Sequence, residues 1–197
     1  MGYSLQIIDN FYNNVDEVRH MALQEDFNID GNYPGHRTKP FLNDSVKEYI
    51  EHHLSPVHGK ILWPDPDDVT SFCGSFQYTT ARDRTWIHAD NTTNWAGVCY
   101  LTPGAPLSAG TALYRHKTTG YMEVPKLPDG EINWPLLDRI QEDGQDITKW
   151  EETCMVGNVY NRMVLYRGDY FHASVDYFGK DRYDGRLFQT FFFNTEK

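Results

Sequence analysis

From residue 69 onward, the chain consists of short runs of β-branched and aromatic residues separated by Gly, Pro, Asp or Asn. Runs of this length and composition, bounded by turn-forming residues, are typical of strands in antiparallel β proteins. We expect strands near residues 70–78, 85–90, 95–101, 110–116, 154–157, 161–166, 169–175 and 186–194. A series of about eight short strands behind a helical segment predicts a mainly β protein with flanking helices, folded as a cupin-like jelly roll or double-stranded β-helix.

The segment ahead of these strands has a different pattern. Apolar residues recur there at near-helical spacing in two places, and the stretch between them is polar and rich in Gly, Pro and Asn. We therefore expect a strand over 4–9, a helix over 15–23, a long loop over 25–44 and a second helix over 45–54.

A length of 197 residues fits one domain. We expect residues 1–68 to form an N-terminal helical support and residues 69–197 to form the jelly-roll core. An insertion at about 121–152 interrupts the core, with several prolines and a short helix expected over 134–141. Long ordered connections in compact domains often act as lids or binding loops, and we expect that role here.

Charge and composition exclude several classes of protein. The 18 basic and 28 acidic residues give a net charge of −10, which argues against a surface for nucleic acid or anionic membranes. No apolar run approaches the roughly 20 residues of a membrane span, and Met1–Gln6 lacks the features of a signal peptide. The three cysteines are odd in number and widely scattered, which fits thiols in a reducing cytosol. We expect a soluble cytoplasmic protein.

The sequence His88-Ala89-Asp90 is the strongest candidate for a metal site. In a strand, alternate side chains share a face, so His88 and Asp90 would project together. His172 lies far downstream in another expected strand and is the candidate third ligand. Two histidines and one carboxylate on one face of an octahedron select non-haem Fe(II) and leave positions open for chemistry. The alternative for His172 is a histidine satisfied within the core.

These residues, in this order, resemble the Fe(II)- and 2-oxoglutarate-dependent oxygenases, and most closely their prolyl-4-hydroxylase-like branch. The resemblance covers roughly residues 71–193 and also the opening Ile7-Ile8-Asp9-Asn10-Phe11. It includes Tyr78, ten residues before His88, and Tyr100, which resemble tyrosines that contact 2-oxoglutarate in that branch. Gly110-Thr111 resembles a Gly-Gly-Thr turn, with Ala109 in place of the first glycine.

The resemblance also implies a basic residue that binds the far carboxylate of 2-oxoglutarate. A guanidinium suits this role because it presents a planar fork of donors with permanent charge. Arg182 and Arg186 follow His172 by 10 and 14 residues, and we favour Arg186 because it opens the expected last strand. Where many relatives carry a hydroxyl two residues later, this chain has Phe188, so Tyr78, Tyr100 or Thr190 would supply the additional hydrogen bond. The alternative for Arg186 is a surface pair with Asp184.

The activity implied by the resemblance is hydroxylation of a C–H bond, with molecular oxygen consumed and 2-oxoglutarate converted to succinate and CO2. His88, Asp90 and His172 would bind Fe(II), and ascorbate is compatible as a reductant. A peptide residue, a free amino acid or another small metabolite is compatible as the substrate. An acidic substrate group could meet Arg82 and Arg84 at the mouth of the site.

Two other classes of protein remain open at this stage. One is a metal- or sugar-binding jelly roll without redox chemistry, and the other is a structural, capsid-like jelly roll. A nucleic-acid demethylase is disfavoured by the acidic charge and by Phe192, which stands where that branch has a second arginine.

Overall fold

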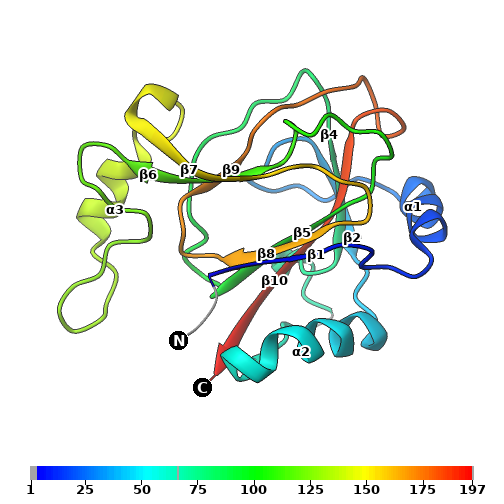
Figure 1. Cartoon of the computed structure of the whole chain (residues 1–197), viewed down its shortest axis with the longest axis horizontal. Helices are drawn as coiled ribbons and strands as arrows, with labels where there is room; N and C mark the ends of the chain where they lie inside the picture. The colour runs from blue at the N-terminus through cyan, green and yellow to red at the C-terminus, as the bar shows by residue number, and fades with distance from the viewer. Residues whose placement is uncertain (1–3, 66, 197) are drawn as a thin grey trace.

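The computed structural model describes residues 4–65 and 67–196, and these fold as two facing antiparallel β-sheets with helices on the outside (Figure 1). One sheet has seven strands and the other has three. Every strand pairing is antiparallel. This is the mainly β, jelly-roll architecture expected from the sequence.

The larger sheet is built around its last strand, β10. Its order is β1-β8-β5-β10-β4-β2, and β3 also pairs with β10. The strands are β1 (Leu5–Ile8), β2 (His36–Pro40), β3 (Lys60–Leu62), β4 (Ser75–Thr79), β5 (Trp95–Tyr100), β8 (Met163–Arg167) and β10 (Arg186–Glu196).

Strand β10 shows why this sheet is buried on both faces. Phe188 packs in the core between the two sheets, whereas Leu187, Phe191 and Phe193 pack in the core beneath the helices. Because successive side chains point to opposite faces, Arg186 shares the inner face with Phe188. The near-continuous apolar run of this strand therefore serves two separate cores.

The smaller sheet has the order β7-β6-β9, with strands β6 (Thr111–His116), β7 (Trp150–Val156) and β9 (His172–Ser174). It lies above the larger sheet in Figure 1. The apolar core between the sheets includes Val98, Leu113, Val164 and Phe188. The mouth between the two sheets is a small cavity lined by residues of both, such as Tyr166 of β8 and His172 of β9.

Two helices cover the outer face of the larger sheet. They are α1 (Val15–Gln24) and α2 (Asp44–His58), and α2 begins at Asn43, whose side-chain oxygen accepts a hydrogen bond of 2.9 Å from Val46 N. Ile50 and Leu54 of α2 are fully buried in the core beneath the helices. A short 3-10 helix, η1 (Val69–Ser71), precedes β4. Within the described residues, no helix is both long enough and apolar enough to cross a bilayer.

The segment between β6 and β7 contains helix α3 (Trp134–Gln141) and a short 3-10 helix, η2 (Ile147–Lys149). Leu137 and Ile140 are fully buried in a third cluster that also includes Ile87 and Ala89, whereas Trp134 is 51 % exposed. The helix bounds agree with those expected.

Several sequence predictions were wrong in detail. The strand expected over 154–157 begins earlier, at Trp150, and β3 was not expected. The expected loop over 25–44 contains β2, which escaped notice because its residues are mostly polar or charged. The expected strand over 85–90 is not a regular strand; its one isolated bridge joins His88 to His172. Strand propensity reflects a fit to neighbouring strands, which a single sequence does not reveal.

Candidate metal centre

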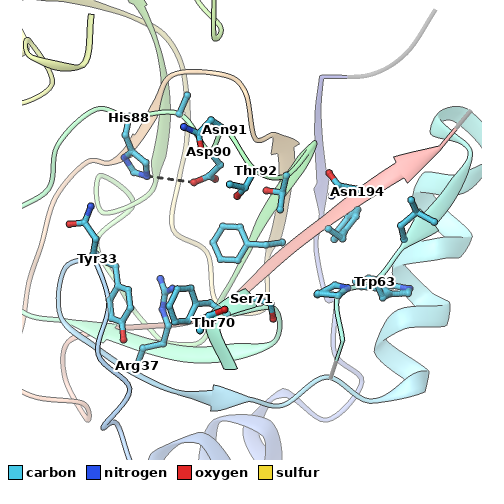
Figure 2. A pocket seen from close by; sticks show the side chains of 18 of the residues that line it. Tyr33, Arg37, Trp63, Thr70, Ser71, His88, Asp90, Asn91, Thr92 and Asn194 are labelled. Atoms are coloured by element: carbon cyan, nitrogen blue, oxygen red, sulfur yellow. Dashed lines mark ion pairs between the residues drawn. The ribbon is translucent and has the colours of Figure 1, made fainter. Parts of the chain in front are cut away.

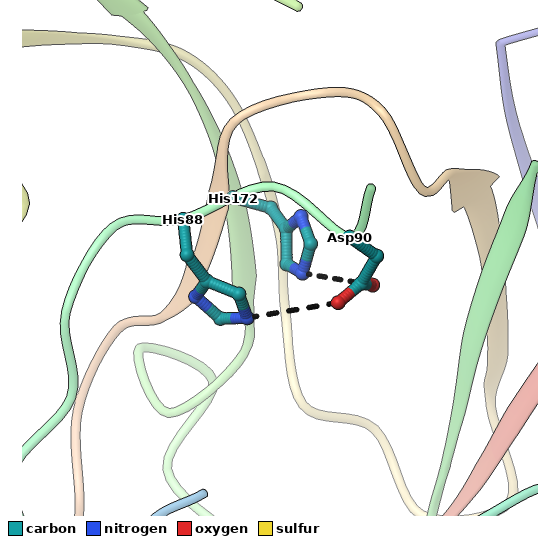
Figure 3. Close-up of side chains that lie close together, drawn as sticks. All are labelled: His88, Asp90 and His172. Carbon is teal, nitrogen blue, oxygen red and sulfur yellow. Dashed lines mark ion pairs between the residues drawn. The ribbon is translucent and has the colours of Figure 1, made fainter. Parts of the chain in front are cut away.

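The three candidate metal ligands lie together at the mouth between the sheets (Figure 3). One ligand atom from each of His88, Asp90 and His172 lies within 4.8 Å of the others. Asp90 Oδ1 is 4.0 Å from His88 Nε2, and Asp90 Oδ2 is 3.6 Å from His172 Nε2. His172 opens β9, so two distant segments of the chain supply the group.

Main-chain hydrogen bonds fix the relative positions of these residues. His88 N donates to His172 O at 3.1 Å, and His172 N donates to His88 O at 2.8 Å. Asp90 N donates to Gly168 O at 2.7 Å, on the connection between β8 and β9. The backbone therefore sets the cluster before any ion binds.

Both imidazoles are oriented in the same way. His88 Nδ1 lies 3.1 Å from Trp86 O, and His172 Nδ1 lies 2.7 Å from Tyr170 O. Because a carbonyl oxygen only accepts, each Nδ1 carries the proton, which leaves the Nε2 lone pair directed at Asp90. A hydrogen bond from the ring nitrogen that does not bind the metal fixes the tautomer of metal-binding histidines.

Burial keeps His172 neutral. Its side chain is 6 % exposed, and burial together with the neighbouring His88 lowers the pKa of His172 to about 4, although Asp90 opposes this shift. The imidazole is therefore uncharged at neutral pH, as a metal ligand requires.

The donor set fits a divalent metal ion. Asp90 Oδ2 is buried and has no hydrogen-bond partner among the described residues, a costly arrangement unless a cation compensates it. Metal–nitrogen and metal–oxygen bonds of about 2.1 Å place neighbouring ligand atoms about 3 Å apart, so small side-chain rotations would complete the geometry. Three ligands on one side leave the other positions open.

Arg186 is fully buried at the start of β10. Its Nε donates to Ala109 O at 2.9 Å and its Nη2 to Gly110 O at 3.5 Å. Its Nη1 is buried and has no partner among the described residues. The expected alternative, a surface pair with Asp184, is therefore not formed, and the guanidinium retains a free donor.

Other polar groups gather around Arg186. Thr79 is its cross-strand neighbour, and the buried Thr79 Oγ1 also has no partner among the described residues. Burial raises the pKa of Tyr177, and hydrogen bonding with Thr85 and the charge of Arg186 partly offset this shift. Tyr100 lies with its ring centroid 5.3 Å from the guanidinium carbon, and its hydroxyl lies 2.8 Å from Thr111 Oγ1.

The remaining sequence candidates have other surroundings. Arg182 donates to the carbonyls of Leu23 and Glu25, at 3.4 and 3.1 Å, and so ties its loop to the end of α1. Tyr78 packs against the core beneath the helices, with its ring centroid 4.9 Å from that of Phe27, and it does not line either cavity beside the candidate metal ligands. Thr190 lines the cavity, but its hydroxyl is bound to Phe72 O at 2.8 Å.

Cavities of about 660 and 90 Å³ adjoin the candidate ligands, and both are lined by His88, Asp90 and Arg37. The smaller one also includes His172 and Tyr166, whose rings have centroids 4.7 Å apart. Sequence reasoning missed both Arg37 and Tyr166. Alternation along β8 could have identified Tyr166, which shares a face with Val164.

Residues 1–193 match the profile of a family of unknown function, DUF6445. No curated protein matches the chain in sequence. Among solved structures, HygX from Streptomyces hygroscopicus with nickel and 2-oxoglutarate bound is 11 % identical, with a TM-score of 0.53 over 98 % of this chain and 83 % of that one. HygX with nickel, 2-oxoglutarate and hygromycin B bound is 10 % identical, with a TM-score of 0.52 and the same coverage.

A prolyl-4-hydroxylase from Pseudomonas putida is 12 % identical, with a TM-score of 0.46 over 98 % of this chain and 94 % of that one. At these identities the likeness to HygX concerns the fold. It confirms the expected jelly roll.

Proposed function

We propose that this chain, which belongs to the DUF6445 family of unknown function, is an Fe(II)- and 2-oxoglutarate-dependent dioxygenase that hydroxylates a C–H bond. The observation that carries the proposal is the preformed group of His88, Asp90 and His172, with ligand atoms within 4.8 Å of one another beside a cavity. Two histidines and one carboxylate with open positions favour non-haem iron.

In this proposal the two Nε2 atoms and the Asp90 carboxylate hold the ion. The Nδ1 bonds to Trp86 O and Tyr170 O keep the rings aimed at it. When bound, iron and 2-oxoglutarate supply the oxidising chemistry, in which molecular oxygen is consumed and succinate and CO2 are released. The chain's part is to hold the ion, orient the organic ligands and limit the access of water.

Arg186 is the proposed partner of the far carboxylate of 2-oxoglutarate. The buried guanidinium has a free Nη1 and forms no ion pair with the described residues, so an anion would compensate its charge, and a carboxylate matches its fork of donors. The hydroxyl of Thr79 is buried without a partner among the described residues and could complete the hydrogen bonding. Tyr100 and Thr111 form the adjacent wall.

We propose that residues 1–197 act as one catalytic domain. Packing of α1 and α2 against the larger sheet supports a scaffold role for residues 1–68, because Ala22, Ile50 and Leu54 share a core with β10. Placement of Ile87 and Ala89 against Leu137 of α3 supports a part for the 121–152 insertion in holding the metal-binding segment.

The decisive experiment measures ligand binding and turnover on the full chain. We expect Fe(II), or Mn(II) without oxygen, to be required for tight 2-oxoglutarate binding by calorimetry. With oxygen, succinate release should rise when a substrate is present, and His88→Ala should abolish it. If metal binds but 2-oxoglutarate does not, and no succinate forms across a broad substrate panel, a non-redox metal-binding jelly roll is the better description.

A further inference from the structure

Arg37 of β2 faces the cavity beside the candidate metal centre. Its side chain belongs to the lining of both cavities that contain His88 and Asp90. In Figure 2, Arg37 and Tyr33 lie across the cavity from His88 and Asp90. Arg37 is therefore placed where a substrate would approach the metal.

The Arg37 side chain is held in place by neutral groups. Its Nε donates to Gln77 Oε1 at 2.9 Å, and its Nη2 donates to the same oxygen. The guanidinium carbon lies 3.8 Å from the ring centroid of Tyr33 and 4.5 Å from that of Phe72. Stacking between aromatic rings leaves the edge of a guanidinium available for a planar acceptor.

No carboxylate contacts this charge directly, and Asp90, which acts on it from a distance, is itself a candidate metal ligand. Arg37 is only 5 % exposed, and it forms no ion pair with any of the described residues. Its Nη1 has no hydrogen-bond acceptor among those residues. Burial lowers the pKa of Arg37 to about 10, although Tyr33 and Asp90 oppose this shift, so the group stays charged at neutral pH. A buried cation without an anion is costly and is characteristic of a binding site.

The cosubstrate cannot compensate both buried arginines. One carboxylate of 2-oxoglutarate would bind at the metal, and the other pairs with Arg186 in the proposed function. Arg37 therefore requires a second anion. Among the described residues that line the 660 Å³ cavity, Arg37 is the only lysine or arginine, and the others are mostly aromatic or neutral polar, such as Trp86, Asn91 and Asn194.

We propose that Arg37 binds a carboxylate group of the substrate, so that the substrate class is a small carboxylic acid such as a free amino acid or a hydroxy acid. This inference rests on the proposed function, because it places the substrate beside that metal centre. A carboxylate is favoured over a phosphate because a single guanidinium in a chain of net charge −10 matches one negative charge. The expected partners of an acidic substrate, Arg82 and Arg84, are exposed and do not belong to this lining.

The first test uses propionate as the probe, with the full chain loaded with Zn(II) and saturating 2-oxoglutarate. The Arg37 Nε–H resonance, identified by its loss in Arg37→Gln, should shift and saturate with propionate and should not respond to propionamide. The absence of a propionate response would overturn the proposal. If the resonance responds to inorganic phosphate and not to propionate, Arg37 binds a phosphate group and the carboxylate proposal is overturned.

The second test compares variants by calorimetry. Arg37→Gln should weaken propionate binding at least tenfold and leave 2-oxoglutarate binding within twofold of the wild type. Arg82→Gln is the matched control and should change neither. If Arg37→Gln does not fold, Arg37→Lys keeps the charge without the fork and should weaken propionate binding severalfold. Equal propionate binding by wild type and variant would overturn the proposal, as would a selective loss of 2-oxoglutarate binding.

The third test uses turnover. Amino acids and hydroxy acids are assayed beside their amides for stimulation of succinate release, and only the acids should stimulate. Stimulation by the amides alone would overturn the assignment. If the proposed function is wrong, the wild type will show no metal-dependent 2-oxoglutarate binding. Arg37 can be tested independently of that result, because its resonance can also be titrated with propionate in metal-free protein.

Discussion

At the scale of single residues, the site depends on which buried polar groups lack partners. Asp90 Oδ2 and Arg186 Nη1 are both buried without partners among the described residues, and both had been identified from the sequence. Buried groups of this kind cost about 1–3 kcal/mol each unless a ligand satisfies them. Because these groups have no partners within the fold, replacing them should weaken ligand binding more than it lowers the stability of the fold.

Arg186→Gln should weaken 2-oxoglutarate binding about ten- to hundredfold, because a charged hydrogen bond contributes roughly 1.5–3 kcal/mol. Arg182→Gln is the matched control. It should lower the thermal midpoint by loosening the loop bound to Leu23 and Glu25, and leave 2-oxoglutarate binding intact. Calorimetry on the metal-loaded variants measures 2-oxoglutarate binding and the thermal midpoint. If Arg182→Gln weakens 2-oxoglutarate binding and Arg186→Gln does not, Arg182 is the residue that binds the far carboxylate.

His172 should make the metal-free protein sensitive to acid. Because its folded pKa of about 4 lies below the unfolded value of about 6.5, the unfolded state binds more protons between these values. The stability contributed by neutral His172 is present above pH 6.5 and is lost as the pH falls towards 4. We expect a loss on the order of 2 kcal/mol between pH 7.5 and 5.

Urea unfolding of chelated protein at the two pH values tests this expectation, with His172→Gln as the comparison. The wild type should lose more stability than the variant on acidification. Equal losses would show that His172 does not carry the effect.

At the scale of elements, the connection between β8 and β9 positions Asp90. A Cβ at Gly168 would come within 2.5 Å of Thr93 O, so the backbone there must move if glycine is replaced. Since Gly168 O accepts the Asp90 N–H, Gly168→Ala should displace Asp90 and weaken Mn(II) binding about tenfold. In Gly157→Ala the nearest atom would lie 3.4 Å away, and metal binding should not change. Unchanged Mn(II) affinity in Gly168→Ala, measured by calorimetry, would contradict this role.

Helix α3 should stabilise the segment that carries His88. Leu137 is fully buried against Ile87 and Ala89, so Leu137→Ala should cost about 2–5 kcal/mol. It should also speed hydrogen exchange at the Ile87 amide, which donates to Gly144 O at 2.8 Å. Trp134→Ala, at a side chain 51 % exposed, is the control and should cost less than about 1 kcal/mol. Unaltered exchange at Ile87 would show that the insertion does not hold this segment.

The lid role of the insertion stays a prediction. Gln141, at the end of α3, lines the larger cavity, which places one end of the insertion beside the expected substrate space. Hydrogen exchange that shows no change over 121–152 on substrate binding would contradict a lid.

At the scale of the whole molecule, metal binding should stabilise the fold, because the ligands come from segments far apart in the sequence. A metal at a hundred times its Kd adds about 2.7 kcal/mol to stability when it binds the folded state alone. Mn(II) should therefore raise the thermal midpoint, and a chelator should reverse the rise. His88→Gln should abolish the rise, whereas His52→Gln, at an exposed position of α2, should retain it. A rise that persists in His88→Gln would place the ion elsewhere.

The fold class and the grouping of His88, Asp90 and His172 could be predicted from the sequence. The periodicity of β10 predicted a buried last strand, and the spacing of His88 and Asp90 placed both on one face, although that segment is not a regular strand. These features are local, because side-chain direction follows from a period of two along extended backbone. Helix α3 could be predicted for the same reason, from its proline and its apolar spacing.

Which side chains meet across the cavity depends on how distant strands pair and pack. Tyr78 and Gln77 are neighbours in β4, yet Gln77 lines the cavity and Tyr78 packs outside it, because a shift of one residue reverses the face. Arg37 gave no signal in the sequence, since its polar strand resembles a loop until β4 pairs with it and the rings of Tyr33 and Phe72 enclose it. Burial of a charged side chain is a property of its neighbours in space, and these neighbours come from distant parts of the chain.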